Sequence, residues 1–94
     1  MKRFGFPKSD RLHLTRDFDR IRRSPHRASG RLLSVRAGPN GSGRSRLGLS
    51  VGRSVGDAVR RNRLKRLVRE AFRIHRERIP SGWDLVVSVR APKD

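Results

Sequence analysis

The chain has 94 residues, a formal net charge of +17 and a pI near 12.0. A small soluble domain needs a net charge of only about 2–8 to stay in solution, so the excess indicates a polyanionic partner. Nucleic acid is the first candidate and an anionic membrane surface is the second. The sequence contains no cysteine, which excludes disulfide frameworks and thiolate metal sites. This length predicts a single domain over residues 1–94.

Residues 1–13 are basic and lack clear periodicity, which predicts an N-terminal arm that is mobile at least in part. The arm has no apolar run of signal-peptide length. Other apolar runs, such as residues 85–87, are far too short to span a bilayer. We therefore expect a cytoplasmic location.

The segment LTRDFDRIRRS predicts a short first helix. Leu14, Phe18 and Ile21 fall at i, i+4 and i+7, which forms one apolar stripe. Thr15 is a candidate cap, and the Pro25 that follows Ser24 should end the helix. Phe18 has two open interpretations, because its ring can pack in the core through this stripe or stack on a nucleic-acid base.

Three strands are predicted from β-propensity and glycine-rich flanks, at residues 30–38, 44–52 and 82–91. The turn cluster at 38–43 predicts that the first two strands are antiparallel. The third strand contains three consecutive apolar residues at 85–87, which favours a central position that is buried on both faces.

A second helix is predicted between the last two strands, in the stretch AVRRNRLKRLVREAFR. Ser54 and Asp57 are both candidate N-caps, and the Ile79-Pro80 pair should stop the helix. At 100° per residue, an apolar face consists of Leu64, Leu67, Val68, Ala71, Phe72 and His75. The opposite face consists of Asn62, Arg66, Arg69, Arg73 and Arg76. The apolar face should pack on the sheet and leave the basic face for a partner.

The charge of this helix has a simple alternative, a solvated surface. Such surfaces mix both signs at i, i+4, whereas residues 58–78 hold nine basic side chains against Glu70 and Glu77. We therefore interpret the helix as a nucleic-acid-binding element. No acid–base pair or metal-ligand spacing stands out, so we expect no catalytic residue and no cofactor or metal bound by the protein alone.

The stretch LGLSVGRSVGDAVRRNRLKRLVREAF closely resembles the signature of the protein subunit of bacterial ribonuclease P. The residues that carry the resemblance are Arg61-Asn62-Arg63, Lys65-Arg66 and Arg69-Glu70. The earlier segment RLHLTRDFDRI resembles the N-terminal helix of that family through Arg11-Leu12 and Asp17-Phe18.

The resemblance implies an α+β fold, a two-layer α/β sandwich with a small mixed sheet. The N-terminal helix precedes the strands, and the basic helix crosses over between the last two strands, in a left-handed connection. It also implies a split function, in which the RNA subunit is the ribozyme that removes the 5′ leader of precursor tRNA. The protein would bind both the ribozyme and the leader, and magnesium would be held mainly by the RNA.

These expectations assign residues to two RNAs. Ribozyme contacts are expected from Arg60, Arg61, Asn62, Arg63, Lys65, Arg66, Arg69 and Arg73. Leader contacts are expected from Phe18, Arg16 and Arg22. Arg22 departs from the family pattern, which commonly has an aromatic or apolar residue there. The family also normally continues into another helix after the last strand.

Three other classes of protein compete with this hypothesis. A ribosomal-type RNA-binding protein shares the composition but not the Arg61-Asn62-Arg63 motif. A DNA-binding helix-turn-helix needs two adjacent helices, whereas strands are predicted on both sides of the basic helix. A membrane-surface helix would need the apolar face that should cover the sheet. We therefore expect neither a membrane nor DNA as a partner.

Overall fold

The computed structural model describes residues 11–12 and 14–90. Phe4 and Phe6 and the rest of the predicted arm lie outside this range, except Arg11 and Leu12. In chain order, the elements are α1 (Thr15–Arg22), β1 (His26–Ser29), β2 (Leu33–Pro39), β3 (Arg46–Val51), the 3-10 turn η2 (Arg53–Val55), α2 (Ala58–Ile74), the 3-10 turn η3 (Arg76–Arg78) and β4 (Trp83–Val89). The strands form one sheet in the order β1-β2-β4-β3.

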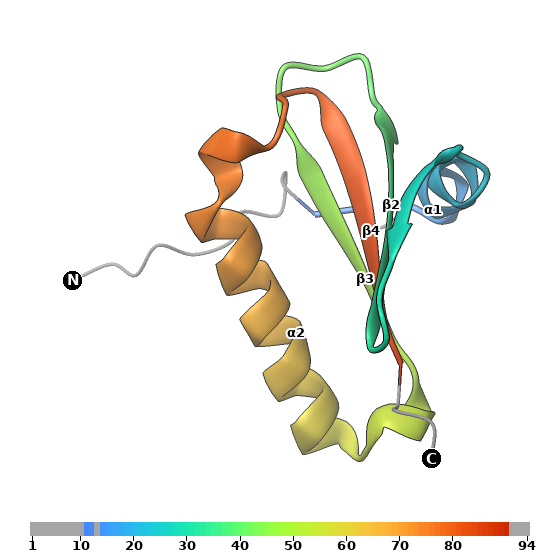
Figure 1. The fold of residues 1–94 in the computed structure, drawn as a ribbon, viewed down its shortest axis with the longest axis vertical. Coiled ribbons are helices and arrows are strands. Elements are labelled where there is room, and N and C mark those ends of the chain that lie inside the picture. The colour runs from blue at the N-terminus through green and yellow to red at the C-terminus, as the bar shows by residue number, and fades with distance from the viewer. Residues whose placement is uncertain (1–10, 13, 91–94) are drawn as a thin grey trace.

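The sheet carries one helix on each face (Figure 1). On one face, Ile21 of α1 packs with Val86 and Leu12, and Phe18 lies against them. On the other face, Phe72 of α2 packs with Val87 and Leu47. Val86 and Val87 are neighbours in β4 and point to opposite faces, as the two-residue repeat of a strand requires. The sheet is therefore the shared wall between two small cores.

β4 is the central strand, as its continuous apolar run predicts. It pairs antiparallel with β2, from Leu33↔Val89 to Pro39↔Trp83, and parallel with β3, from Arg46↔Asp84 to Val51↔Val89. The parallel pair is joined by α2, which confirms the predicted α+β fold with a mixed sheet and a crossover helix.

The first two predicted strands are antiparallel, as expected, but their neighbours in the sheet and the start of the first strand differ from the prediction. β2 and β3 run in opposite directions but do not pair, because β4 lies between them. The partner of β2 on its other side is β1, a short strand that was missed because His26–Ser29 has no apolar pattern and is exposed along its whole length. The predicted strand at 30–38 begins only at Leu33, since residues 30–32 form the connection from β1.

The helix ends also differ from their predictions. Thr15 does not cap α1: the N-cap residue is Leu14, which makes no side-chain capping bond. Of the two candidates at α2, Asp57 is the cap, and its Oδ1 accepts a hydrogen bond from the Arg60 backbone N–H at 2.9 Å. Leu67, predicted to be on the packed face, is 59% exposed. It lies on the rim of an open apolar groove between α2 and the sheet.

Two local contacts fix α1 and the segment before it on the sheet. Leu12 donates its backbone N–H to the carbonyl of Leu47 at 2.9 Å, so the chain forms one parallel bridge with the outer edge of β3. Gly48 of β3 lies under the Phe18 ring, and a Cβ at that position would come within 2.7 Å of the ring. Only glycine lets Phe18 approach the sheet this closely.

Candidate nucleic-acid interface

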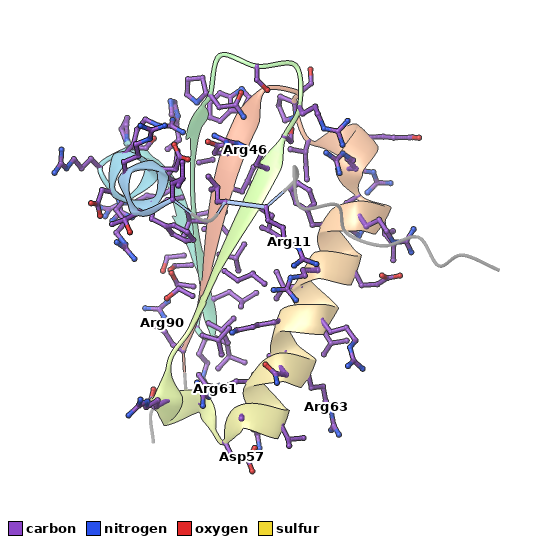
Figure 2. The ribbon with its side chains drawn as sticks, turned by 180° about the vertical axis from the view of Figure 1, so that it is seen from behind. Arg11, Arg46, Asp57, Arg61, Arg63 and Arg90 are labelled. Carbon is purple, nitrogen blue, oxygen red and sulfur yellow. The ribbon has the colours of Figure 1, made fainter. Side chains whose placement is uncertain are left out.

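The Arg61-Asn62-Arg63 motif lies in the first turns of α2 and divides between two directions. Arg63 is exposed and points away from the sheet, whereas Arg61 points toward it (Figure 2). Arg61 is half-buried and donates its Nε–H to the carbonyl of Gly56 at 3.2 Å. Arg61 therefore braces the loop before α2, while Arg60, Asn62 and Arg63 are exposed to a partner.

The remaining predicted ribozyme contacts are spread around α2. Arg66 is exposed, and Lys65 and Arg69 are half-buried beside the edge of β3. Arg73 forms an ion pair with Glu70 on the helix surface. Arg73 donates hydrogen bonds to that carboxylate, and these raise the pKa of Arg73.

Arg76 does not belong to the outward basic face. Its guanidinium lies 5.4 Å from the centroid of the Phe72 ring, and it donates a hydrogen bond to the Ser45 carbonyl at 3.0 Å. It covers the end of the core because the chain leaves the α-helix at Ile74 and turns through η3. Of the basic face predicted from Asn62 to Arg76, Asn62 and Arg66 are therefore exposed, whereas Arg69, Arg73 and Arg76 are half-buried.

The predicted leader residues gather on the other helix, α1. Phe18 is half-buried against Leu12, Ile21 and Val86, so its packing role is established. Arg22 places its guanidinium 5.7 Å from the Phe18 ring centroid and pairs with Asp19 at 3.2 Å. Arg16 is exposed. Phe18 and Arg22 therefore form a joined aromatic–cation surface, and Arg16 lies on the same short helix.

A row of four serines, which no pattern in the sequence indicates, crosses the sheet on the face that carries α1. The strand registers place Ser29 opposite Ser34, Ser34 opposite Ser88, and Ser88 opposite Ser50. Paired positions share a face, and the neighbouring pair Arg36↔Val86 places this row on the α1 side. Small hydroxyl side chains leave this part of the sheet uncrowded and provide hydrogen-bond donors and acceptors.

Three arginines flank this serine row and were also missed. Arg27 lies opposite Arg36, and both line a hollow of about 460 Å³ with Ser29, Ser34 and Arg90. Arg90 donates to the Ser29 hydroxyl at 3.1 Å and to the Gly30 carbonyl at 2.7 Å. No motif marks these residues in the sequence, because only the strand pairing brings them together. The serine row and the three arginines are called the serine–arginine face below.

The buried carboxylate of Asp84 joins α1 to the end of the sheet where β2 ends and β3 begins. Asp84 has no exposed surface and receives Nε and a terminal nitrogen of Arg46 at 2.8 and 2.7 Å, the side chain of Asn40 at 2.7 Å, and Arg20 of α1. Burial alone would raise the pKa of Asp84, but the hydrogen bonds and charges of these partners outweigh burial and lower the pKa below its ordinary value. Arg20 lies 64 residues before Asp84 in the sequence, so the fold and not local spacing brings the two together.

No group of three histidine or acidic side chains within 11–12 and 14–90 is arranged to hold a metal ion. None of the helices in these ranges is long and apolar enough to cross a membrane. The residues of α1, α2 and the serine–arginine face offer guanidinium, ammonium and hydroxyl groups and the Phe18 ring, which suit the phosphates, sugars and bases of an RNA.

The sequence of this chain is similar to those of known proteins of one family. The family model for ribonuclease P matches residues 6–94. The ribonuclease P protein component of Herpetosiphon aurantiacus is 44% identical over 84 residues, which are 89% of this chain and 68% of the relative. The component from Thermotoga maritima is 44% identical over 86 residues, which are 92% of this chain and 74% of the relative.

The fold is also similar to solved structures of this family. The RNase P protein of Staphylococcus aureus superposes with a TM-score of 0.81 at 36% identity, over 88% of this chain and 76% of that one. The RNase P protein of Thermotoga maritima gives 0.77 at 45% identity, over 85% and 73%. These likenesses confirm the resemblance carried by the Arg61-Asn62-Arg63 motif and do not favour a ribosomal-type protein. The chain belongs to the ribonuclease P protein family.

Proposed function

We propose that this chain acts in ribonuclease P by dividing its surface between two RNAs, one on each side of the sheet. The exposed cations of α2 bind the ribonuclease P RNA. The surface of α1 and the serine–arginine face bind the single-stranded 5′ leader of precursor tRNA. The RNA subunit carries out the hydrolysis in the cytoplasm, and magnesium is held mainly by that RNA.

One observation carries the proposal, namely that two different kinds of basic surface lie on opposite faces of one sheet. The α2 surface is a rigid helix with cations spaced along it, which suits the phosphates of a folded RNA. The α1 side combines the Phe18 ring, Arg22 and the row of serines. A ring beside hydroxyl and guanidinium groups suits unpaired nucleotides, because bases stack on the ring while the other groups contact the backbone.

Reconstitution tests this function. The protein is mixed with a bacterial ribonuclease P RNA and a precursor tRNA at low magnesium, and the release of the 5′ leader is measured. We expect strong stimulation over the RNA alone, and no cleavage by RNA-free protein after nuclease treatment and repurification. Cleavage by the repurified protein would place the chemistry on the protein and contradict the proposal.

Replacing Phe18 with leucine separates its contact with the leader from its packing. Leucine keeps an apolar side chain against Leu12 and Ile21 but removes the aromatic face. Stacking on one base contributes about 1–3 kcal/mol, so the holoenzyme should bind precursor tRNA roughly tenfold more weakly. Its affinity for mature tRNA, which has no leader, should be unchanged. Both affinities are measured in one competition assay.

A paired set of glycine variants controls for the position of the ring. Gly48→Ala pushes on the Phe18 ring, because its Cβ would lie 2.7 Å away, whereas Gly43→Ala has no neighbour within 4 Å. Gly48→Ala should reproduce the selective loss of precursor tRNA binding, and Gly43→Ala should not. If Phe18→Leu weakens both tRNAs equally, Phe18 serves only in packing and the leader assignment is wrong.

A further inference from the structure

Arg20 is the side chain that ties α1 to the buried carboxylate of Asp84. Its guanidinium also donates a hydrogen bond to the carbonyl of Pro39 at 2.8 Å, so it bridges the neighbouring strands β4 and β2. Asp17, which lies one turn earlier in α1, is 3.7 Å from Arg20 and 3.8 Å from Arg46. Together, Arg20, Asp17, Asp84 and Arg46 form a cluster that we call the α1 clamp.

The charges of the α1 clamp balance one another. It contains two carboxylates and two guanidinium groups, so its formal charges cancel. The chain has only eight acidic residues against 25 lysines and arginines, and two of those acids lie here. The clamp therefore holds Arg20 in the fold and adds no net charge to the basic surface of the protein.

The strand registers divide the sheet under α1 into three successive rows. On this face, β4 presents Asp84, Val86 and Ser88 in turn, each with its register partners in β2 and β3. α1 lies over the middle row, because the Phe18 ring covers Gly48, which is the partner of Val86. The row of Asp84 is therefore on one side of the helix, and the row of serines is on the other side.

The helical repeat divides the side chains of α1 between the same two sides. Ile21 is fully buried and faces the sheet. At 100° per residue, Asp17 and Arg20 then lie on one flank of the helix, and Phe18 and Arg22 lie on the other flank. A roll of α1 about its axis would therefore displace the clamp and the Phe18 ring in opposite directions relative to the sheet.

Both ends of α1 are attached to the sheet by local hydrogen bonds. Before the helix, Leu12 donates its backbone N–H to the Leu47 carbonyl at 2.9 Å. After the helix, the Ser24 hydroxyl donates to the Ala37 carbonyl at 2.6 Å. These bonds hold the two ends of an eight-residue helix, and the core beneath it has only three buried side chains. Arg20 contacts the sheet from the flank of the helix, where it opposes a roll.

We propose that Arg20 is a positioning residue for recognition of the leader. By holding Asp84 and Pro39, it fixes the roll of α1 and thereby the place of the Phe18 ring beside the row of serines. Arg20 acts through Phe18 and does not itself contact the RNA. The consequence for the leader rests on the proposed function, whereas control of the roll by Arg20 does not.

The roll is tested first in the full chain without RNA. The α protons of Gly48 lie under the Phe18 ring, where a Cβ would be 2.7 Å from the ring, so their NMR shifts report the position of the ring. Arg20→Met removes the guanidinium but leaves Asp84 bonded to Arg46 and Asn40. We expect the Gly48 signals to move toward the shifts of a glycine without a ring above it.

Arg23→Met is the matched control, because it removes the same charge from the exposed C-cap residue of α1. It should leave the Gly48 signals at their wild-type positions. Unchanged Gly48 signals in Arg20→Met would overturn the proposal. If Arg20→Met does not fold, judged by circular dichroism, Arg20→Lys keeps the charge but loses the fork of donors, and it should move the signals in the same direction by a smaller amount.

The effect on the leader is tested with the reconstituted holoenzyme. Arg20→Met should weaken binding of precursor tRNA roughly fivefold, as part of the stacking on Phe18 is lost, and leave binding of mature tRNA unchanged. In a Phe18→Leu background, Arg20→Met should weaken it by less than about twofold further, because both substitutions act through one ring.

Two results would overturn the positioning role. One is a pair of losses that multiply in the double variant. The other is a slope of log affinity against log salt that falls by about 1 more in Arg20→Met than in Arg23→Met, because that would show a direct phosphate contact. If the wild-type holoenzyme does not distinguish precursor from mature tRNA while Arg20→Met still moves the Gly48 signals, the proposed leader function fails and control of the roll by Arg20 stands.

Discussion

Replacing Asp84 with asparagine is expected to lower the free energy of unfolding by about 2–4 kcal/mol. The carboxylate has no exposed surface and accepts hydrogen bonds from Arg46, Asn40 and Arg20, which come from three separate parts of the chain. Asparagine keeps the shape but removes the charge, so both guanidinium groups lose their nearest counterion and keep only the longer pairs with Asp17, at 3.7 and 3.8 Å. Because Arg20 and Arg46 are partly exposed, water recovers some of that loss. The measurement is urea unfolding followed by circular dichroism.

The matched control is Asp19→Asn. Asp19 pairs with Arg22 at 3.2 Å, but both side chains are about half exposed. An exposed pair contributes about 0–1 kcal/mol, so this variant should unfold close to the wild type. Equal destabilisation by the two substitutions would contradict the role of Asp84 as the central acceptor.

Acid should have the same effect as Asp84→Asn. The pKa of Asp84 is lower in the folded protein than in the unfolded chain, so the unfolded chain binds more protons at low pH. Its contribution to stability is therefore complete above the unfolded pKa of about 3.9 and is lost as the pH falls through the folded pKa. The unfolding free energy of Asp84→Asn should vary less with pH across this acidic range than that of the wild type.

Raising the salt concentration from 50 to 200 mM is expected to weaken binding of the ribonuclease P RNA by roughly a thousandfold. This follows if about six cations of the α2 surface contact phosphates, because each contact releases bound counterions from the RNA. The plot of log affinity against log salt should then have a slope of about −4 to −5. Filter binding over a salt series measures it.

Arg63 and Arg61 are expected to affect RNA binding and stability differently. Arg63→Ala should reduce the slope by about 1, because Arg63 is exposed and its charge is available to one phosphate. Arg61→Ala should also lower the melting temperature, because Arg61 donates to the carbonyl of Gly56. A slope shallower than about −2 for the wild type would mean that α2 is not the main phosphate-binding surface.

The elements with strong periodicity could be predicted from the sequence. The apolar stripe of α2, apart from Leu67, and the central position of β4 follow from residue spacing, and the same spacing narrows the cap of α2 to Ser54 or Asp57. β1 could not be predicted, because its four residues are exposed and stabilised by pairing with β2. The insertion of β4 between β2 and β3 could not be predicted either. The turn-forming residues between β2 and β3 look the same whether the two strands pair directly or lie on either side of a third strand.

The candidate site was predictable only where it lies on one helix. The cations of α2 are close in sequence, so counting charges finds them. Ser29, Ser34, Ser50 and Ser88 come from four strands and meet only through the sheet register. A single backbone bridge to Leu47 of β3 places Arg11 in the same pocket as Arg69. No spacing rule in the sequence predicts that these two residues lie close together.

The order of strands in the sheet has a consequence for biosynthesis. β4 is made after every other strand, yet it is the seam that joins β2 to β3 and supplies Val86 and Val87 to the two cores. In a nascent chain that has emerged only as far as Pro80, β3 therefore has no strand to link it to the β1–β2 pair. Both cores also lack their residue from β4. Most of its arginines are already outside the ribosome at that stage. The unfolded chain thus presents its cations to cellular RNA before the sheet can close.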